Sequence, residues 1–189
     1  WEEWFMEKSE VFKKELDCIF DSRIAEFTKL AIESLPDYFF TIPASSTGKY
    51  HPTFASGEGG LVRHTKAAVA YAEQMFHLEQ NEGAFNKETR DIVIASLIIH
   101  DGFKCGYEYE GKTNPKHPTL MANWIVKQPF SSLITGFQLK NICDCIASHM
   151  GQWNTDENGY EINPKPTKEI QKFVHLCDYL SSRNWESFL

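Results

Sequence analysis

The most constraining feature of this sequence is that histidines and aspartates occupy helix positions at which the hydrophobic pattern calls for an apolar side chain. In residues 61–76, apolar side chains recur at spacings of three and four, and His64 lies on the same stripe, four residues before Ala68. Three further segments repeat this arrangement, with His100 and Asp101 closing the apolar run 92–99, His149 ending the stripe of residues 137–149, and Asp178 following Val174 by four residues. Burying polar groups without partners is expensive, so each of these side chains needs a partner in the interior.

The hydrophobic spacing predicts an all-α fold, a helical bundle around a metal centre. We expect two helices between residues 4 and 35, divided near Asp21 and Ser22, and then helices over 61–76, 87–99, from 117 onwards, 137–149 and 167–180. The segments 36–60 and 151–166 are rich in turn-forming residues and are expected to be loops, the second with room for one short hairpin. The length of 189 residues suits one domain. We divide it into structural helices (1–35), an active-site loop (36–60) and a metal-binding core (61–185).

Composition excludes several classes of protein. The net charge is −7 and no basic block relieves it, which argues against a partner such as duplex DNA. The five cysteines form no CxxC pair and are expected to be reduced thiols of a cytoplasmic protein. No apolar stretch reaches the ~18 residues of a membrane span, and the acidic N-terminus is unlike a signal peptide. The chain begins with Trp1 rather than Met, which is compatible with a processed or excised segment.

A shared divalent cation is the simplest way to satisfy several buried imidazoles and carboxylates at once. One buried histidine alone is usually hydrogen-bonded to a backbone carbonyl, but a set that converges from several helices favours a metal. Nitrogen and oxygen ligands without thiolate suit Mn, Fe, Zn, Co, Ni or Mg. The sequence has no P-loop, GxGxxG or GxSxG pattern, so any nucleotide binding would be organised around the metal.

These residues, in this order, resemble the HD-domain superfamily of metal-dependent phosphohydrolases. The likeness covers roughly residues 55 to 185 and rests on four strings, GGLVRHT (59–65), IHDGFK (99–104), ASHMG (147–151) and HLCDYL (175–180). Within this superfamily, the sequence resembles the HD portions of bacterial 3′-to-5′ exoribonucleases and small phage HD hydrolases, including those that dephosphorylate deoxynucleoside triphosphates. The sequence departs from many relatives in the Gly-Phe that follows the HD pair and in Met150, which stands where a second histidine is frequent.

The resemblance implies a set of metal ligands. His64, His100, Asp101 and Asp178 would bind a first divalent cation, and a bridging Asp101 with His117 and His149 would bind a second. A metal-activated hydroxide would attack phosphorus. With one metal only, His117 and His149 would act as general acid and phosphate contact.

The expected substrate is a free nucleotide, most simply a deoxynucleoside mono- or triphosphate. Lys104, three residues after Asp101, is expected to meet a phosphate oxygen, because HD relatives often have a lysine at this position. Further candidates for substrate binding are Arg63, Lys49, Tyr50, His51 and Trp153, the aromatic ones by stacking on a base. His77 is expected to be exposed. His175, three residues before Asp178, is a candidate only for an outer contact of the site.

The same residues are compatible with other activities. The same residues suit a 3′-to-5′ exonuclease or a phosphodiesterase acting on short single-stranded nucleic acid or cyclic nucleotides. The scaffold would also suit a nucleotide-sensing module without turnover, or a di-iron oxygenase. The sequence does not distinguish these, nor the native metal or the oligomeric state.

Overall fold

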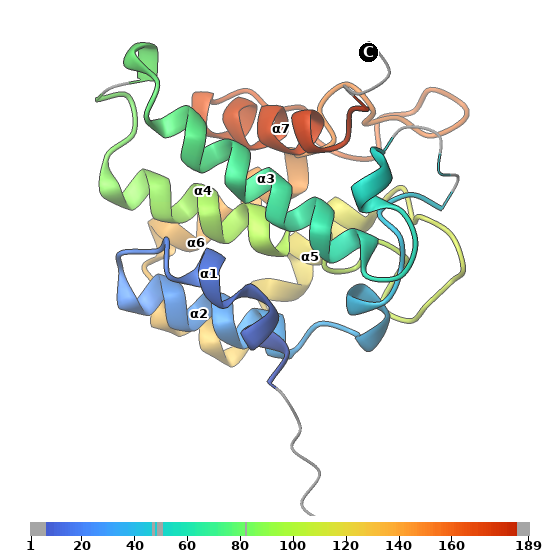
Figure 1. Ribbon diagram of the computed structural model, residues 1–189, viewed down its shortest axis with the longest axis horizontal. Helices are drawn as coiled ribbons and strands as arrows, with labels where there is room; N and C mark the ends of the chain where they lie inside the picture. Colours follow the sequence, from blue (N-terminus) through green and yellow to red (C-terminus); the bar gives the residue numbers. More distant parts are fainter. Residues whose placement is uncertain (1–6, 47, 49–50, 82, 185–189) are drawn as a thin grey trace, which may run out of the picture.

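The computed structural model describes residues 7–46, 48, 51–81 and 83–184, and these residues form packed helices joined by loops (Figure 1). The prediction of an all-α fold is confirmed, because the only β-pairing among the described residues is one isolated bridge between Thr155 and Glu161. The α-helices are α1 (Lys13–Leu16), α2 (Ser22–Glu33), α3 (Gly60–Phe76), α4 (Lys87–Ile99), α5 (His117–Ile125), α6 (Gly136–Ser148) and α7 (Glu169–Ser181). Short 3-10 helices are η1 (Lys8–Phe12), η2 (Asp37–Phe40), η3 (Thr53–Ala55), η4 (Glu79–Asn81) and η5 (Pro129–Leu133).

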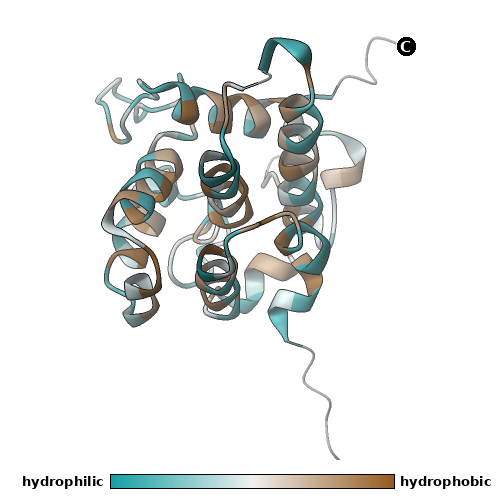
Figure 2. Ribbon diagram, turned by 90° about the vertical axis from the view of Figure 1, so that its left-hand side faces the viewer, coloured by the Kyte–Doolittle hydropathy of each residue, from teal (hydrophilic) through white to brown (hydrophobic). Residues whose placement is uncertain are grey.

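Helix α4 is the centre of the bundle. Its residues 91–99 are all buried, and it packs against α2, α3, α6 and α7. Figure 2 shows that the hydrophobic surfaces of the helices face the interior. The apolar run 92–99, interrupted by Ser96 alone, predicted an enclosed helix, and neighbours on most of its sides explain it.

Side-chain caps fix where several helices begin. Asp21 accepts a hydrogen bond from the Arg23 amide (2.8 Å) at the start of α2, which places the division between the first helices where the sequence predicted it. Helix α6 begins with a capping box in which Thr135 and Gln138 bond each other's backbone amides (2.9 and 3.2 Å). The helices predicted from residue 61 onwards agree with the observed bounds to within two residues at the ends that were predicted.

Asp91 connects the N-terminal helices to this centre. Its carboxylate accepts hydrogen bonds from the backbone amides of Phe20 (2.9 Å) and Asp21 (2.8 Å), immediately before α2. Asp91 is 1% exposed. None of the helices in the described part of the chain is long and apolar enough to cross a membrane.

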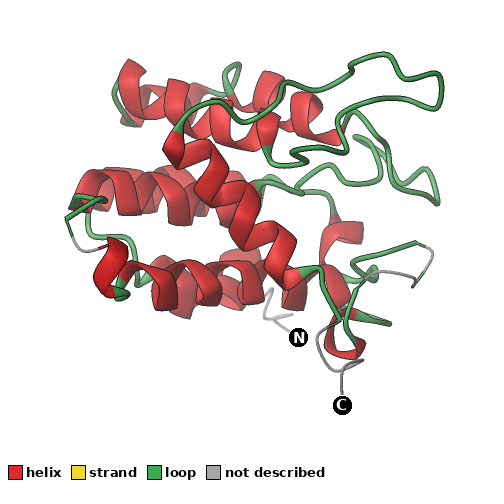
Figure 3. Cartoon of the chain, turned by 90° about the horizontal axis from the view of Figure 1, so that it is seen from above, coloured by secondary structure: helices red, strands yellow, loops and turns green. Residues whose placement is uncertain are grey.

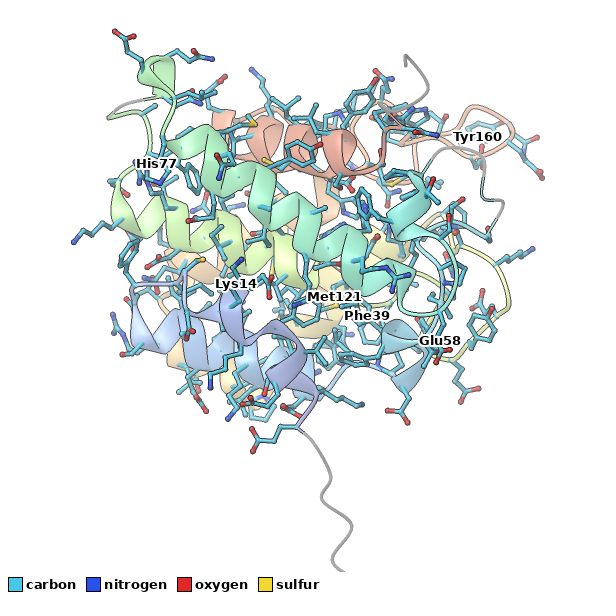
Figure 4. All side chains as sticks on the ribbon, in the orientation of Figure 1. Lys14, Phe39, Glu58, His77, Met121 and Tyr160 are labelled. Carbon is cyan, nitrogen blue, oxygen red and sulfur yellow. The ribbon has the colours of Figure 1, made fainter. Side chains whose placement is uncertain are left out.

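The long loops gather at one end of the bundle (Figure 3). Segment 36–60 was predicted as a loop, and its described residues contain η2 and η3. The loop is fastened to the start of α3, because the Leu61 amide donates to the Ile42 carbonyl (3.0 Å). Gly60 allows the loop residue Ala55 to lie against the start of α3, since a Cβ atom at position 60 would lie 2.1 Å from the Ala55 carbonyl oxygen. Figure 4 places Glu58 and Tyr160 at this end of the molecule and His77 at the other.

Candidate metal centre

Five elements bring histidine and aspartate side chains together at the loop end of the bundle. His64 lies in the second turn of α3, and His117 is the first residue of α5. His100 and Asp101 directly follow α4, His149 directly follows α6, and Asp178 lies in the last turn of α7. The first five side chains are at most 1% exposed and that of Asp178 is 16% exposed. All six residues predicted as ligands from the sequence thus lie in one cluster.

The first half of the cluster is formed by His64, His100 and two carboxylate oxygens. His64 Nε2 is 3.0 Å from Asp178 Oδ1 and 3.7 Å from Asp101 Oδ2. His100 Nε2 is 3.4 Å from Asp101 Oδ2 and 3.5 Å from Asp178 Oδ1. Two imidazoles and two carboxylates therefore surround one point.

The second half is formed around the other oxygen of Asp101. Asp101 Oδ1 is 2.9 Å from His117 Nε2 and 3.6 Å from His149 Nε2, and these two nitrogens are 3.1 Å apart. The two oxygens of one carboxylate thus face two different groups of imidazoles. Three overlapping sets could each hold a metal ion, namely His64, His100 and Asp101; His100, His149 and Asp178; and Asp101, His117 and His149.

Hydrogen bonds on the far side of each imidazole fix its orientation. The Nδ1 atoms of His100, His117 and His149 each lie 2.7 Å from the carbonyl oxygen three residues earlier in the chain. A carbonyl only accepts, so each Nδ1 carries the proton and, in the neutral ring, the Nε2 lone pair faces the cluster.

Ser181 fixes the orientation of the His64 ring in the same way, and the sequence analysis did not predict this role. The Ser181 hydroxyl donates to the Asp178 carbonyl oxygen (2.8 Å) and lies 3.0 Å from His64 Nδ1, from which it accepts. Its position three residues after Asp178, on the same side of α7, was the available signal. Four Nε2 atoms are therefore directed at one region.

The cluster contains more acceptors than donors, which is the condition that a cation relieves. His64 Nε2, His100 Nε2 and Asp101 Oδ1 are buried and have no hydrogen-bond partner within the described part of the chain. Asp101 Oδ1 and His117 Nε2 approach each other, but that contact lacks hydrogen-bond geometry. Buried polar atoms are normally paired. The donor set, imidazole nitrogens and carboxylate oxygens, fits a divalent cation.

Electrostatics keep both carboxylates ionised. Burial by itself would raise the pKa of Asp101, but Lys104 and His100 hold that pKa well below its usual value. The pKa of Asp178 is likewise held low by His100 and His64 against the effect of burial.

Two of the imidazoles are shifted in opposite directions. Burial lowers the pKa of His149 to about 4, so its ring is neutral at pH 7. For His100, burial also lowers the pKa, but the carboxylates of Asp101 and Asp178 outweigh this effect and raise it to about 10. Without a metal, a proton on His100 thus supplies part of the positive charge that the carboxylates attract.

Lys104 supplies the nearest side-chain cation. Its ammonium nitrogen is 2.5 Å from Asp101 Oδ2, and its side chain is 11% exposed. The backbone N–H of Asn114 donates a hydrogen bond to the backbone carbonyl of Lys104 (2.8 Å), which fixes the main chain at this point. Lys104, the predicted phosphate contact, therefore lies directly against Asp101, the predicted bridging ligand.

The cluster opens into a cavity of about 370 Å³. Of the residues predicted to bind substrate, His51, Lys104 and Trp153 line this cavity. Arg63 is not brought to it, because its guanidinium donates to the carbonyl oxygens of Phe54 and Ser56 and so braces the loop before α3. Lys49 and Tyr50 lie outside the described residues.

His51, predicted to bind substrate, packs directly against the cluster. Its ring packs edge-on against His64, with 5.0 Å between the ring centres. Burial lowers the pKa of His51 to about 3, and its Nδ1 atom has no hydrogen-bond partner in the described part of the structure. The ring therefore forms a neutral wall of the cavity beside His64.

His175, for which the sequence offered only an outer contact, supports His149. Its Nδ1 atom lies 2.7 Å from the His149 carbonyl oxygen. Gly151 leaves room for this contact, since a Cβ there would lie 2.2 Å from the His175 ring, and its φ of +59° also favours glycine. His77 is exposed, as expected.

Comparisons of this chain with protein-family models, with curated proteins and with solved structures gave no match.

Proposed function

We propose that this protein is an HD-type metal-dependent phosphohydrolase that cleaves a phosphate ester or anhydride of a nucleotide. The observation that carries the proposal is the position of Asp101, whose two carboxylate oxygens face two groups of buried imidazole nitrogens at an open cavity. The order of the ligand residues along the chain and their places at helix ends agree with the resemblance drawn from the sequence.

In this proposal the ligands are the residues of the cluster. His64, His100, Asp101 and Asp178 would hold one divalent cation, and Asp101, His117 and His149 a second. Divalent cations in such sites lower the pKa of bound water and stabilise negative charge on a phosphoryl group. The backbone carbonyls and Ser181 hold the histidine rings so that Nε2 faces the ligand position, and such outer contacts keep ligands oriented.

The cavity also offers positive charge, although the chain as a whole is acidic. Lys104 and Arg183 both line it. Lys104, which contacts Asp101, would meet a phosphate oxygen at the cluster, and a nucleotide phosphate would thus be bound between a side-chain cation and the cluster. The cavity volume of about 370 Å³ lies in the range of sites for one small ligand, which favours a free nucleotide over a polymer.

Activity assays on the purified chain test this proposal. The protein is stripped of metal, reloaded separately with Mn²⁺, Fe²⁺, Co²⁺, Ni²⁺, Zn²⁺ or Mg²⁺, and incubated with deoxynucleoside mono- and triphosphates. We expect metal-dependent release of phosphate or pyrophosphate from at least one of them. Asp101→Ala should abolish this release, whereas Tyr160→Ala, which changes an exposed side chain of a surface loop (72% exposed), should leave it unchanged.

Three results would contradict the proposal. Cleavage of oligonucleotides or cyclic nucleotides alone would favour the exonuclease or phosphodiesterase. Nucleotide binding without turnover under any metal would favour a sensor. Oxygen consumption with an Fe²⁺-loaded sample and a polyol or phosphonate would favour the oxygenase.

A further inference from the structure

The cavity has two chemically different walls. One is ionic and includes Asp101, Asp178 and Lys104. The other is aromatic and is formed by Trp153 and Tyr179, together with Arg183. A ligand that fills the cavity would therefore contact both charged groups and flat rings.

The aromatic wall is a preassembled stack. The rings of Trp153 and Tyr179 are nearly parallel, with an angle of 12° and 5.7 Å between their centres. The Arg183 guanidinium carbon lies 4.4 Å from the centre of the Tyr179 ring and 5.1 Å from that of Trp153. A guanidinium over aromatic rings is an attractive cation–π arrangement, so Arg183 positions both rings.

Chain connectivity ties this stack to the metal cluster. Tyr179 is the neighbour of Asp178 in α7, and Arg183 follows Tyr179 by four residues. Trp153 follows His149 by four residues, in the loop after α6. The stack and the cluster are thus built by the same two segments, which fixes the distance between them.

Trp153 remains available to a ligand. Its side chain is 43% exposed although it lines the cavity and is held by Tyr179 and Arg183. Tyr160, on the same loop, is more exposed but projects from the outer part of the molecule, as its label in Figure 4 shows. A rigid aromatic surface binds a planar ring with little loss of side-chain freedom.

From this arrangement we propose that Trp153, Tyr179 and Arg183 form the base-binding subsite of this protein. The planar base of a mononucleotide stacks on Trp153 while its phosphate reaches Lys104 and the cluster. The inference deepens the proposed function and rests on it for the position of the phosphate. It assigns substrate recognition to Tyr179 and Arg183, which the sequence did not single out.

Binding measurements on the full chain in EDTA test the subsite without turnover. The probes are the four common deoxynucleoside 5′-monophosphates and 2-deoxyribose 5-phosphate, which keeps the sugar and phosphate but has no base. Isothermal titration calorimetry should show at least one nucleotide binding about 5- to 150-fold more tightly than the base-free probe, the range expected from stacking one base.

Variants of the loop decide whether Trp153 provides this preference. Trp153→Leu, which keeps an apolar side chain, and Trp153→Ala should both remove the advantage of the base, and Trp153→Phe should retain most of it. Tyr160→Ala is the matched control and should bind all probes like the parent protein. Far-ultraviolet circular dichroism and thermal melting verify that each variant is folded.

The proposal is overturned if every nucleotide binds no more tightly than 2-deoxyribose 5-phosphate, or if a folded Trp153→Leu protein keeps the full preference for a base. These outcomes are distinct from failure of the proposed function. Phosphate release with Mn²⁺ but no base preference would refute the subsite alone, whereas base-dependent binding in a protein that takes up no metal would refute the hydrolase alone.

Discussion

Replacing Ser181 by alanine gives the sharpest test of how the metal centre is held, because it leaves every proposed ligand in place. The Ser181 hydroxyl oxygen lies 3.0 Å from His64 Nδ1. Ser181 as a residue is 1% exposed. In Ser181→Ala the Nδ1 proton of His64 loses its acceptor, and an unsatisfied buried donor costs about 1 to 3 kcal/mol. For a chain of this size each kcal/mol corresponds to about 2 to 4 °C in Tm.

The same change should weaken metal binding. Loss of a group that orients a ligand histidine typically lowers metal affinity about 10- to 100-fold, which is about 1.4 to 2.7 kcal/mol. Mn²⁺ affinity is measured by titration calorimetry on the stripped protein. Ser131→Ala is the matched control, because Ser131 is a buried serine whose hydroxyl donates to the Ile125 carbonyl, at the opposite end of α5 from His117. If both variants lose stability but bind Mn²⁺ with the affinity of the parent protein, Ser181 does not orient a metal ligand and the reasoning is wrong.

Three further predictions concern the carboxylates of Asp101, Asp91 and Glu33. Asp101→Asn should reduce the metal content found by mass spectrometry after dialysis to background, because both halves of the cluster share this carboxylate; stoichiometric metal in that variant would contradict the assignment. Asp91→Ala should lower the free energy of unfolding in urea by about 2 to 3 kcal/mol, since two backbone amides lose their acceptor, and Asp91→Asn, which keeps one acceptor oxygen, should lose less. The pKa of Glu33 is lowered, because hydrogen bonds from Ser9 and the amide of Lys8 outweigh the opposing effect of burial. The stabilisation from Glu33 is therefore present above the unfolded-state pKa of 4.5 and is lost as the pH falls through the folded-state pKa. Glu33→Gln should thus reduce the dependence of the free energy of unfolding on pH below 4.5, as measured by urea titrations. An unchanged pH profile would refute this.

The sequence predicted the helices well because burial and local capping agree. In α4 the run 91–99 is apolar except for two residues, and Asn86 caps its start by accepting from the Thr89 amide (2.9 Å). In α6 the Thr135 box and the apolar stripe select the same first turn. Where the local pattern and the tertiary environment select the same state, periodicity is enough to place an element.

The sequence predicted less about the loops and the outer contacts of the site. Arg63 adjoins His64 in the sequence, and this proximity suggested a substrate contact, but its guanidinium is used by carbonyl groups of the preceding loop. Ser181 and Arg183 carry no motif of their own, and the partners that tie them to the site, His64 and Trp153, are 117 and 30 residues away in the chain. Contacts of this kind depend on how helices pack, which a single sequence does not encode in its periodicity.

The placement of the histidines at helix ends has a physical reason. The last carbonyl groups of an α-helix lack partners within the helix. His100 and His149, which directly follow α4 and α6, donate their Nδ1 protons to such carbonyls, those of Leu97 and Ile146. One hydrogen bond thus satisfies a helix terminus and also selects the tautomer that leaves Nε2 free to bind. This double use explains why a ligand histidine can lie at the end of an apolar helix: the backbone supplies the outer partner, and only the inner nitrogen requires a cation.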